Sequence, residues 1–207
     1  MAFLNLAAIR ECTEAEGPGK RFAIWCQGCP RSCPGCCNVK MQDFSKKYIV
    51  DVNDVISLIS KSHLQNKIEG VTFIGGEPFF QSEGFAEIAE WCHNNGLSVI
   101  CFTGFLYDEL KSMGNSSIDR LLLNLDILVD GPFIQEEFDT ERDWVGSKNQ
   151  KVYFMSDFYK PGIEFEHKEH SMEIMISEKE LLVNGWPFAI NGDKNDDCVK
   201  ISSQFLS

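Results

Sequence analysis

Apolar residues recur along the chain at two spacings, one typical of helices and one typical of short buried strands. Apolar positions at i, i+3, i+4 and i+7 predict one helix over 52–64 and another over 82–92. Asp51 or Asn53 can cap the first helix, because a short polar side chain can accept a hydrogen bond from its first turn. The segment 94–96, Asn-Asn-Gly, ends the second helix.

Short apolar runs bounded by glycine, proline or polar residues predict strands between these helices. The runs are 1–10, 22–25, 71–74, 97–102 and 125–129, and two further helices are expected at 107–113 and 118–123. Strands that alternate with helices predict an α/β fold with a parallel sheet. In such sheets the functional residues gather in loops after the carboxyl ends of the strands.

The pattern changes after residue 150. Short strands are expected there at 152–155, 163–166, 172–176 and 181–183, which predicts a small antiparallel β extension. A chain of 207 residues can form one domain with a full hydrophobic core. We therefore expect a main unit over residues 1–150 and a C-terminal extension over 151–207, packed on the same domain.

Charge and composition narrow the classes of function. The chain has 19 Lys and Arg against 31 Asp and Glu, and this net charge of -12 disfavours binding to nucleic acid. Its apolar start lacks the basic region of a signal peptide, and no apolar run approaches the length of a membrane span. We therefore expect a cytoplasmic protein that does not bind membranes.

Five of the nine cysteines lie within residues 26–37, and in a reducing compartment such crowding favours a metal site over disulfides. Zinc ribbons separate their two cysteine pairs by about a dozen residues or more. Here three residues separate Cys29 from Cys33, so a four-cysteine zinc site is strained but stays an alternative. Bacterial ferredoxins use a different order, C-x2-C-x2-C-x3-C. A third interpretation takes Cys29, Cys33 and Cys36 as the ligands of a four-iron cluster with one iron left open for chemistry.

The cysteine loop resembles that of the radical S-adenosylmethionine (SAM) superfamily, whose signature is C-x3-C-x2-C. Gly75-Gly76-Glu77-Pro78 matches the superfamily's GGEP motif. More narrowly, the chain is similar to the activating proteins of anaerobic ribonucleotide reductase. The segments that carry this narrower resemblance are Gly17-Pro18-Gly19-Lys20-Arg21, Gln27-Gly28-Cys29, Cys33-Pro34-Gly35-Cys36, Asp130-Gly131 and 146–150.

This resemblance implies a fold, a chemistry and a set of site residues. The fold would be an incomplete (β/α)6-type radical SAM barrel, with a [4Fe-4S] cluster on Cys29, Cys33 and Cys36 and with SAM chelated by the open iron. One electron from the cluster would split the sulfonium and release a 5′-deoxyadenosyl radical. The residues expected around SAM are Gly35, Cys37, Gly75, Gly76, Glu77, Pro78, Thr103, Asp130 and Gly131.

The resemblance also implies partners. The radical would take hydrogen from a glycine of a partner glycyl radical enzyme, in the first place an anaerobic ribonucleotide reductase, and a flavodoxin or ferredoxin would supply the electron. Two features depart from the subfamily: Cys37 stands where an aromatic residue is usual, and the chain is longer after residue 150. The extra residues could cover a small substrate, so a radical SAM enzyme acting on a small molecule or a ribosomal peptide is a second hypothesis. A non-enzymatic cysteine–metal binding module is the third.

Overall fold

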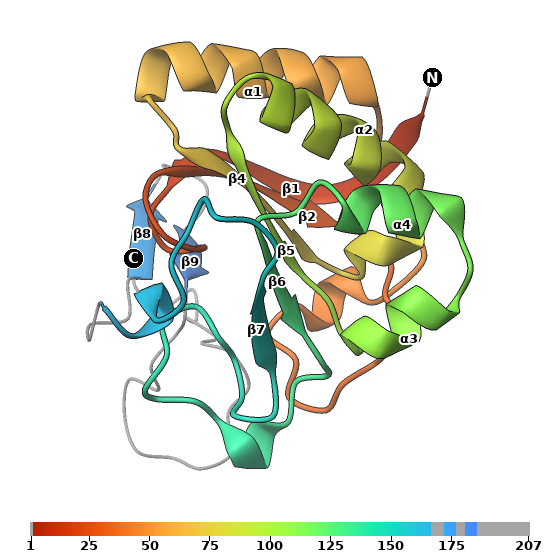
Figure 1. Ribbon diagram of the computed structural model, residues 1–207, viewed down its shortest axis with the longest axis vertical. Helices are drawn as coiled ribbons and strands as arrows, with labels where there is room; N and C mark the ends of the chain where they lie inside the picture. The colour runs from red at the N-terminus through yellow and green to blue at the C-terminus, as the bar shows by residue number, and fades with distance from the viewer. Residues whose placement is uncertain (1, 167–171, 177–180, 186–207) are drawn as a thin grey trace, which may run out of the picture.

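A computed structural model describes residues 2–166, 172–176 and 181–185 of the chain. Its centre is a seven-stranded sheet in the order β3-β1-β2-β4-β5-β6-β7 (Figure 1). The strands of this sheet are β1 (Phe3–Thr13), β2 (Arg21–Cys26), β3 (Tyr48–Asp51), β4 (Gly70–Gly75), β5 (Ser98–Phe102), β6 (Ile127–Asp130) and β7 (Lys151–Phe154).

The helices lie between the strands, as the sequence predicts. They are α1 (Val52–Asn66), α2 (Ser82–Asn94), α3 (Tyr107–Ser112) and α4 (Ser116–Leu122), with short 3₁₀ helices at Val39–Met41, Pro78–Gln81, Gln135–Glu137 and Ile163–Phe165. The Asp51 side chain accepts a hydrogen bond of 2.8 Å from the backbone N–H of Asn53 and so caps α1.

Strand directions confirm the α/β class. β2, β4, β5 and β6 are parallel neighbours at the centre of the sheet. β1 pairs antiparallel with β2, β3 with β1, and β7 with β6, so the edges of the sheet are antiparallel. The incomplete radical SAM barrel stays a prediction, because this mixed sheet has four parallel strands at its centre and reversed strands on either side.

The main hydrophobic core lies between the sheet and the helices α1, α2 and α4, which cover one of its faces (Figure 1). β2 is buried along its whole length, which explains why its residues after Arg21 are apolar without alternation. Phe73 of β4 packs on Phe85 of α2 with ring centroids 4.6 Å apart. Each fully buried phenylalanine contributes roughly 1.5–3 kcal/mol of hydrophobic stabilisation.

A smaller core covers the other face of β5 and β6. Ile100, Ile127 and Val129 pack there against Val145 and Tyr159. Tyr159 and the whole of β7 come from the C-terminal extension expected after residue 150. The start of that extension is therefore built into the main sheet and its core.

A buried arginine joins the amino ends of the parallel strands. Arg21, at the start of β2, is fully buried, and its Nε donates to Thr72 Oγ1 at 2.7 Å. Its two terminal nitrogens donate to Val71 O at 2.6 Å, to Ser98 Oγ at 3.1 Å and to Tyr159 Oη at 2.9 Å. One guanidinium therefore links β2, β4, β5 and the segment after β7. The arginine of the Gly-Pro-Gly-x-Arg segment thus has a structural role.

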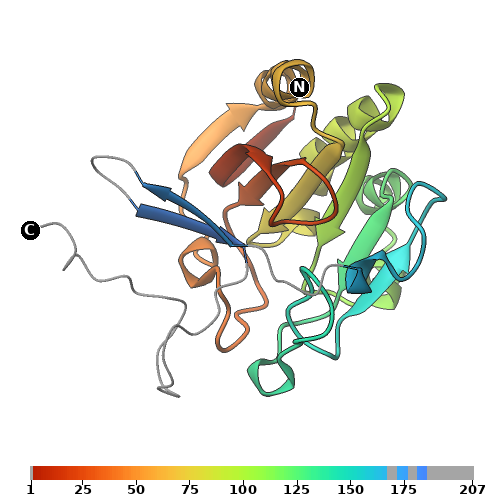
Figure 2. The ribbon, with the colours of Figure 1, turned by 90° about the vertical axis from the view of Figure 1, so that its left-hand side faces the viewer.

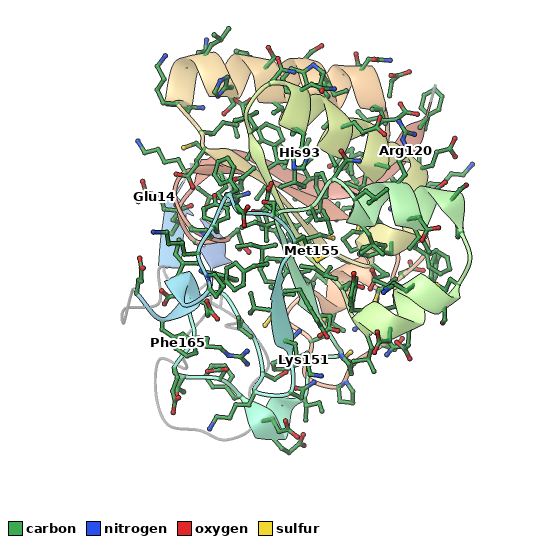
Figure 3. All side chains as sticks on the ribbon, viewed as in Figure 1. Glu14, His93, Arg120, Lys151, Met155 and Phe165 are labelled. Atoms are coloured by element: carbon green, nitrogen blue, oxygen red, sulfur yellow. The ribbon has the colours of Figure 1, made fainter. Side chains whose placement is uncertain are left out.

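The C-terminal extension differs in part from its prediction. The antiparallel pair is confirmed as β8 (Met172–Ile176) and β9 (Leu181–Gly185), which form a separate two-stranded sheet (Figure 2). The backbone N–H of Glu14, labelled in Figure 3, donates to Glu173 Oε1 at 2.8 Å and so ties this hairpin to the end of β1. The predicted connection 177–180 and residues 186–207 lie outside the described residues.

The strand expected at 163–166 is wrong, because Ile163–Phe165 form a 3₁₀ helix. Gly162 adopts a left-handed conformation with φ of 104°, and its N–H donates to Glu164 Oε2 at 2.9 Å. Phe165 N–H then donates back to Gly162 O at 3.0 Å, which closes a tight turn. Apolar residues at alternate positions imitated a strand, but the preceding glycine reverses the backbone.

Among the described residues, no helix has both the length and the apolar character needed to cross a bilayer.

We predict that Arg21→Ala lowers the free energy of unfolding by about 3 kcal/mol or more, because it leaves several buried polar groups without their donor. Arg120→Ala is the control: Arg120 lies on the helical side of the molecule (Figure 3) and pairs with Glu90, but its side chain is 42% exposed. Loss of that surface pair should cost about 1 kcal/mol or less. Urea denaturation of both variants measures the difference, and equal losses would contradict the structural role of Arg21.

Candidate iron–sulfur and cofactor site

The predicted site loops follow the carboxyl ends of the four parallel strands. The cysteine loop follows β2, Gly75 ends β4 and 76–78 follow it, Thr103 follows β5, and Gly131 follows β6. Parallel pairing of Cys26 with Gly75 and of Phe102 with Val129 brings these ends to one edge of the sheet. Figure 3 labels two residues that show where this rim lies. Lys151 is at the end of β7 that lies on the rim, and Met155 is just beyond the other end of β7.

The cysteine loop is closed by backbone hydrogen bonds at its base. Gly28 N–H donates to Met41 O at 2.8 Å, and Cys29 N–H donates to Gln42 O at 3.0 Å. The buried carboxamide of Gln27 adds two bonds, from Nε2 to Lys40 O and to Asp43 O. The sequence marked Gln27 only as part of the Gln-Gly-Cys segment, whereas the structure gives it the role of fastening the two ends of the loop together.

The three predicted cluster ligands are partly exposed on this loop. Cys29, Cys33 and Cys36 carry thiols that form no disulfide. Within the described part of the chain, no three His, Cys, Asp or Glu side chains are grouped closely enough to share one metal ion. A structural zinc site needs such a group around a single ion. The thiolates of an iron–sulfur cluster bind different irons and so need not converge on one point.

Burial, charge and hydrogen bonds act on the Cys29 thiol in opposite directions. Partial burial raises the pKa of the Cys29 thiol, and the negative charge of Glu77 acts in the same direction. Backbone hydrogen bonds from Arg31 and Ser32 act in the opposite direction and lower this pKa. Iron bound at the thiolate would offset its desolvation, and the two backbone groups would remain as donors to the sulfur.

Gly76 allows the GGEP loop to touch the cysteine loop. Its N–H donates to Cys26 O at 2.8 Å, and the N–H of Glu77 donates to Gly28 O at 2.9 Å. A Cβ atom at position 76 would lie 2.4 Å from Gly28 O and 2.9 Å from Met41 O. The structure therefore brings together the two motifs that the sequence paired only by resemblance, and glycine is required at their contact.

Glu77 is fully buried at the centre of the rim. Its Oε1 accepts hydrogen bonds from Thr103 Oγ1 at 2.8 Å and from Phe79 N–H at 3.1 Å, and its Oε2 accepts one from Gly104 N–H at 2.9 Å. Burial raises the pKa of Glu77 to about 7, although these three donors and Arg31 act to lower it. The carboxyl group thus joins the loops after β4 and β5.

Arg31 connects the cysteine loop to the loop after β5, a role that the sequence did not indicate. Its guanidinium lies over the ring of Phe105, 4.9 Å from the centroid, and faces Glu109 at 3.6 Å. A Cβ atom at Gly104 would lie 2.8 Å from Cγ of Arg31, so the two loops are in close contact. No local pattern marks such a contact, because its partners are distant in sequence.

Asp130 and Gly131 extend this set of contacts to the loop after β6. Buried Asp130 accepts hydrogen bonds from Tyr107 N–H at 2.7 Å and Lys151 N–H at 3.3 Å. Gly131, with φ of 100°, donates to Phe105 O at 2.9 Å. Gln150 Nε2 donates to Gly131 O at 3.0 Å, which explains why the segment 146–150 accompanies this loop. A SAM contact at Asp130 stays a prediction, since both carboxylate oxygens bind backbone groups here.

The remaining predicted residues lie around the same rim. Gly35 has φ of 70°, and a Cβ there would lie 2.3 Å from Oε1 of Gln135 in the segment after β6. Cys37 is partly exposed beside Cys36, and Pro78 is buried at the first position of the 3₁₀ helix Pro78–Gln81. Contacts therefore run from the cysteine loop through Glu77 and Phe105 to the loop after β6, and back through Gln135 to Gly35.

These residues fit an iron–sulfur cluster. Three thiols lie on one loop, backbone groups can donate to a sulfur, and a glycine opens the adjoining loop to close approach. Comparison with known proteins agrees: residues 15–153 match the family described as a 4Fe-4S single cluster domain. This match defines the class, a single-cluster iron–sulfur protein.

Comparison with curated relatives identifies a family within this class of iron–sulfur proteins. Over 153 residues the chain is 31% identical to the anaerobic ribonucleoside-triphosphate reductase-activating protein of Salmonella typhimurium, an alignment that covers 67% of this chain and 91% of the relative. It is 30% identical over 154 residues to the protein of the same name from Escherichia coli K12, with the same coverage of both chains. The protein of this name from Enterobacteria phage T4 is 26% identical over 159 residues, 74% of this chain and 96% of the relative. The chain belongs to the family of anaerobic ribonucleoside-triphosphate reductase-activating proteins.

We predict that Gly76→Ala lowers the iron bound after anaerobic reconstitution, because the new methyl group would displace the backbone of the cysteine loop. Gly114→Ala is the control, since a Cβ at Gly114 meets nothing within 4 Å. Its φ of 59° should still cost about 1–2 kcal/mol of stability. Iron analysis per chain distinguishes the two variants, and full iron loading of Gly76→Ala would contradict the role given to this glycine.

We also predict a pH dependence of stability from Glu77. With a pKa raised from 4.5 to about 7, the folded chain binds more protons than the unfolded chain between these values. The contribution of Glu77 to stability is therefore complete below about pH 4.5 and declines as the pH rises through 7, by up to about 3 kcal/mol. Urea denaturation of the metal-free protein across this range should give a flatter profile for Glu77→Gln than for the wild type. If the stability profiles of the wild type and Glu77→Gln ran parallel, the raised pKa assigned to Glu77 would be wrong.

Proposed function

We propose that the chain is a radical SAM activating enzyme. It would hold a [4Fe-4S] cluster on Cys29, Cys33 and Cys36, cleave SAM reductively, and use the resulting 5′-deoxyadenosyl radical to remove a hydrogen atom from a glycine of an anaerobic ribonucleotide reductase. The coarser part of this function, a single-cluster iron–sulfur protein of the activating family, follows from the comparisons above.

The chemistry comes from the bound groups, and the chain positions them. When bound, the cluster would pass one electron to the sulfonium of SAM, so that the C5′–S bond breaks into methionine and the 5′-deoxyadenosyl radical. The three cysteines would hold the iron, and Gly75 and Gly76 would give the methionine moiety access to the backbone. Glu77 and Thr103 keep the loops after β4 and β5 together. Gly35, Cys37, Pro78, Asp130 and Gly131 complete the proposed SAM pocket.

One observation carries the proposal: the GGEP loop is hydrogen-bonded directly to the base of the cysteine loop, through Gly76 to Cys26 and through Glu77 to Gly28. A purely structural metal site on the cysteine loop would need no such loop beside it. A site that binds a cofactor at an open iron needs a second element next to the cluster, and the GGEP loop lies where it could be that element.

The proposed partner follows from the relatives, whose name describes the activation of anaerobic ribonucleoside-triphosphate reductase. Installing a glycyl radical would consume one electron and one SAM, and the glycine hydrogen atom would pass to the 5′-deoxyadenosyl radical, which becomes 5′-deoxyadenosine. We propose a flavodoxin- or ferredoxin-type protein as the source of the electron, and the cytoplasm as the site of action.

The first test is reductive cleavage of SAM. Reconstituted protein with SAM and dithionite should yield 5′-deoxyadenosine, and the triple variant Cys29→Ala, Cys33→Ala, Cys36→Ala should yield none. Cys12→Ser is the matched control, because Cys12 is an exposed cysteine on β1, away from the loop. If the wild type gives no 5′-deoxyadenosine, the chain is a metal-binding module instead, and product from the triple variant would rule out the ligand assignment.

A second test concerns the substrate. Adding the anaerobic reductase from the same organism should produce a glycyl radical signal in electron paramagnetic resonance, with one 5′-deoxyadenosine per radical. Cleavage of SAM without this signal would favour the alternative, a radical SAM enzyme that modifies a small molecule or a ribosomal peptide.

A further inference from the structure

An exposed apolar surface adjoins the base of the cysteine loop. Three large side chains on it are more than half exposed: Phe44, Ile49 and Phe80. We define the Phe44 patch as these three residues together with Lys46 and Lys47, which are also exposed. Exposed aromatic and aliphatic residues are often scattered singly on a protein surface, whereas grouped ones mark binding surfaces.

The patch is made from two segments. Ile49 lies on the face of β3 that Asn5 shares on β1, because the two residues are paired. The rings of Phe44 and Phe80 are in contact, with centroids 5.3 Å apart. Phe44 also lies against the backbone of Gly28, because a Cβ at that glycine would be 2.9 Å from the ring. Since Gly28 directly precedes Cys29, the patch is continuous with the base of the cysteine loop.

Asn5 and Gln81 hold the patch in place. Asn5 Nδ2 donates to Ser45 O at 2.9 Å, and Asn5 Oδ1 accepts from Lys47 N–H at 2.9 Å. Gln81, next to Phe80, donates through Nε2 to Asn5 O at 3.0 Å and accepts from Asn5 N–H at 2.7 Å. The exposed side chains therefore stand on an ordered backbone, which lowers the entropy that a partner must remove on binding.

Charge distinguishes this surface from the rest of the chain. The whole sequence has 31 acidic against 19 basic residues. In the segment that carries the patch, residues 40–50, the balance is reversed, with Lys40, Lys46 and Lys47 against Asp43 as the single acid. A basic surface on an acidic protein attracts an acidic partner to this place and repels it elsewhere.

Among the residues that the structure describes, the patch borders an unpaired strand edge. Tyr48 and Ile49 begin β3, which pairs with β1 on one side and ends the seven-stranded sheet on the other. An edge strand offers backbone donors and acceptors to a second chain, and Lys46 and Lys47 precede it directly. Apolar contact, backbone pairing and positive charge are thus available on one surface.

We propose that the Phe44 patch is the docking surface for an acidic face of the reductase that this chain activates. The inference rests on the proposed function, because that function requires a large protein substrate to deliver a glycine to the cysteine-loop rim. A patch in contact with Gly28 lets the partner bind at the side of the site without covering the cysteines.

The test compares binding of the full-length chain to the anaerobic reductase of the same organism. One variant combines Ile49→Thr with Phe80→Ser, and another combines Lys46→Glu with Lys47→Glu. Their controls alter exposed residues elsewhere: Leu64→Ser on α1 with Leu123→Ser just after α4 for the apolar pair, and Lys61→Glu on α1 for the charges. Sedimentation or interferometry gives the dissociation constant at two salt concentrations, and circular dichroism checks folding.

We expect the apolar variant to weaken binding about tenfold or more, as loss of interface anchors does. The charge variant should weaken it most at low salt and mainly through the association rate. All variants should keep the uncoupled cleavage of SAM. Wild-type affinity in both patch variants would overturn the inference, and so would a loss confined to binding of the electron donor. If the wild type cleaves SAM but does not bind the reductase, the partner named in the proposed function is wrong and the inference falls with it.

Discussion

The buried guanidinium of Arg21 is the interaction on which the arrangement of the strands depends. A charge removed from water must have its donors satisfied, and the acceptors that Arg21 finds are those of β4, β5, Tyr159 and the nearby Pro18 when these elements are in their observed positions. Close packing makes the constraint stronger: a Cβ at Gly70 would lie 2.3 Å from Ser98 O and 2.7 Å from Nη2 of Arg21. Parallel pairing fixed at these amino ends fixes the positions of the opposite ends as well.

At the opposite end of the same strands, a second buried ionisable group links the elements. Glu77 joins the loops after β4 and β5, and Arg31 adds the cysteine loop to them. The three loops are far apart in sequence, so their relative positions come from the strand register and from these side chains together. The rim is therefore a product of the whole sheet, and the cysteine loop takes its position from residues outside its own motif.

The local sequence pattern predicted the positions of helices and strands better than the directions in which the strands run. The helical spacing of apolar residues predicted α1 and α2, because that signal lies within each segment. The antiparallel course of β1, β3 and β7 depends on pairing between distant segments, which no local pattern contains. In the site, spacing and motif predicted the cysteines and the GGEP loop, whereas Gln27 and Arg31 act through contacts that exist only after folding.

The structure refines what a glutamate in the GGEP motif can do. Glu77 is completely buried, and its carboxylate already accepts three hydrogen bonds from Phe79, Thr103 and Gly104. If a ligand amine took the place of one of these donors, it would be the Thr103 hydroxyl, because of the three only this group can rotate away without moving the backbone. Thr103 also accepts from Phe105 N–H at 3.1 Å, so such a rotation would disturb the loop whose Phe105 ring contacts Arg31 of the cysteine loop. Occupation of the cofactor pocket and the position of the cysteine loop would then be coupled through Thr103, although Thr103 itself need not touch iron.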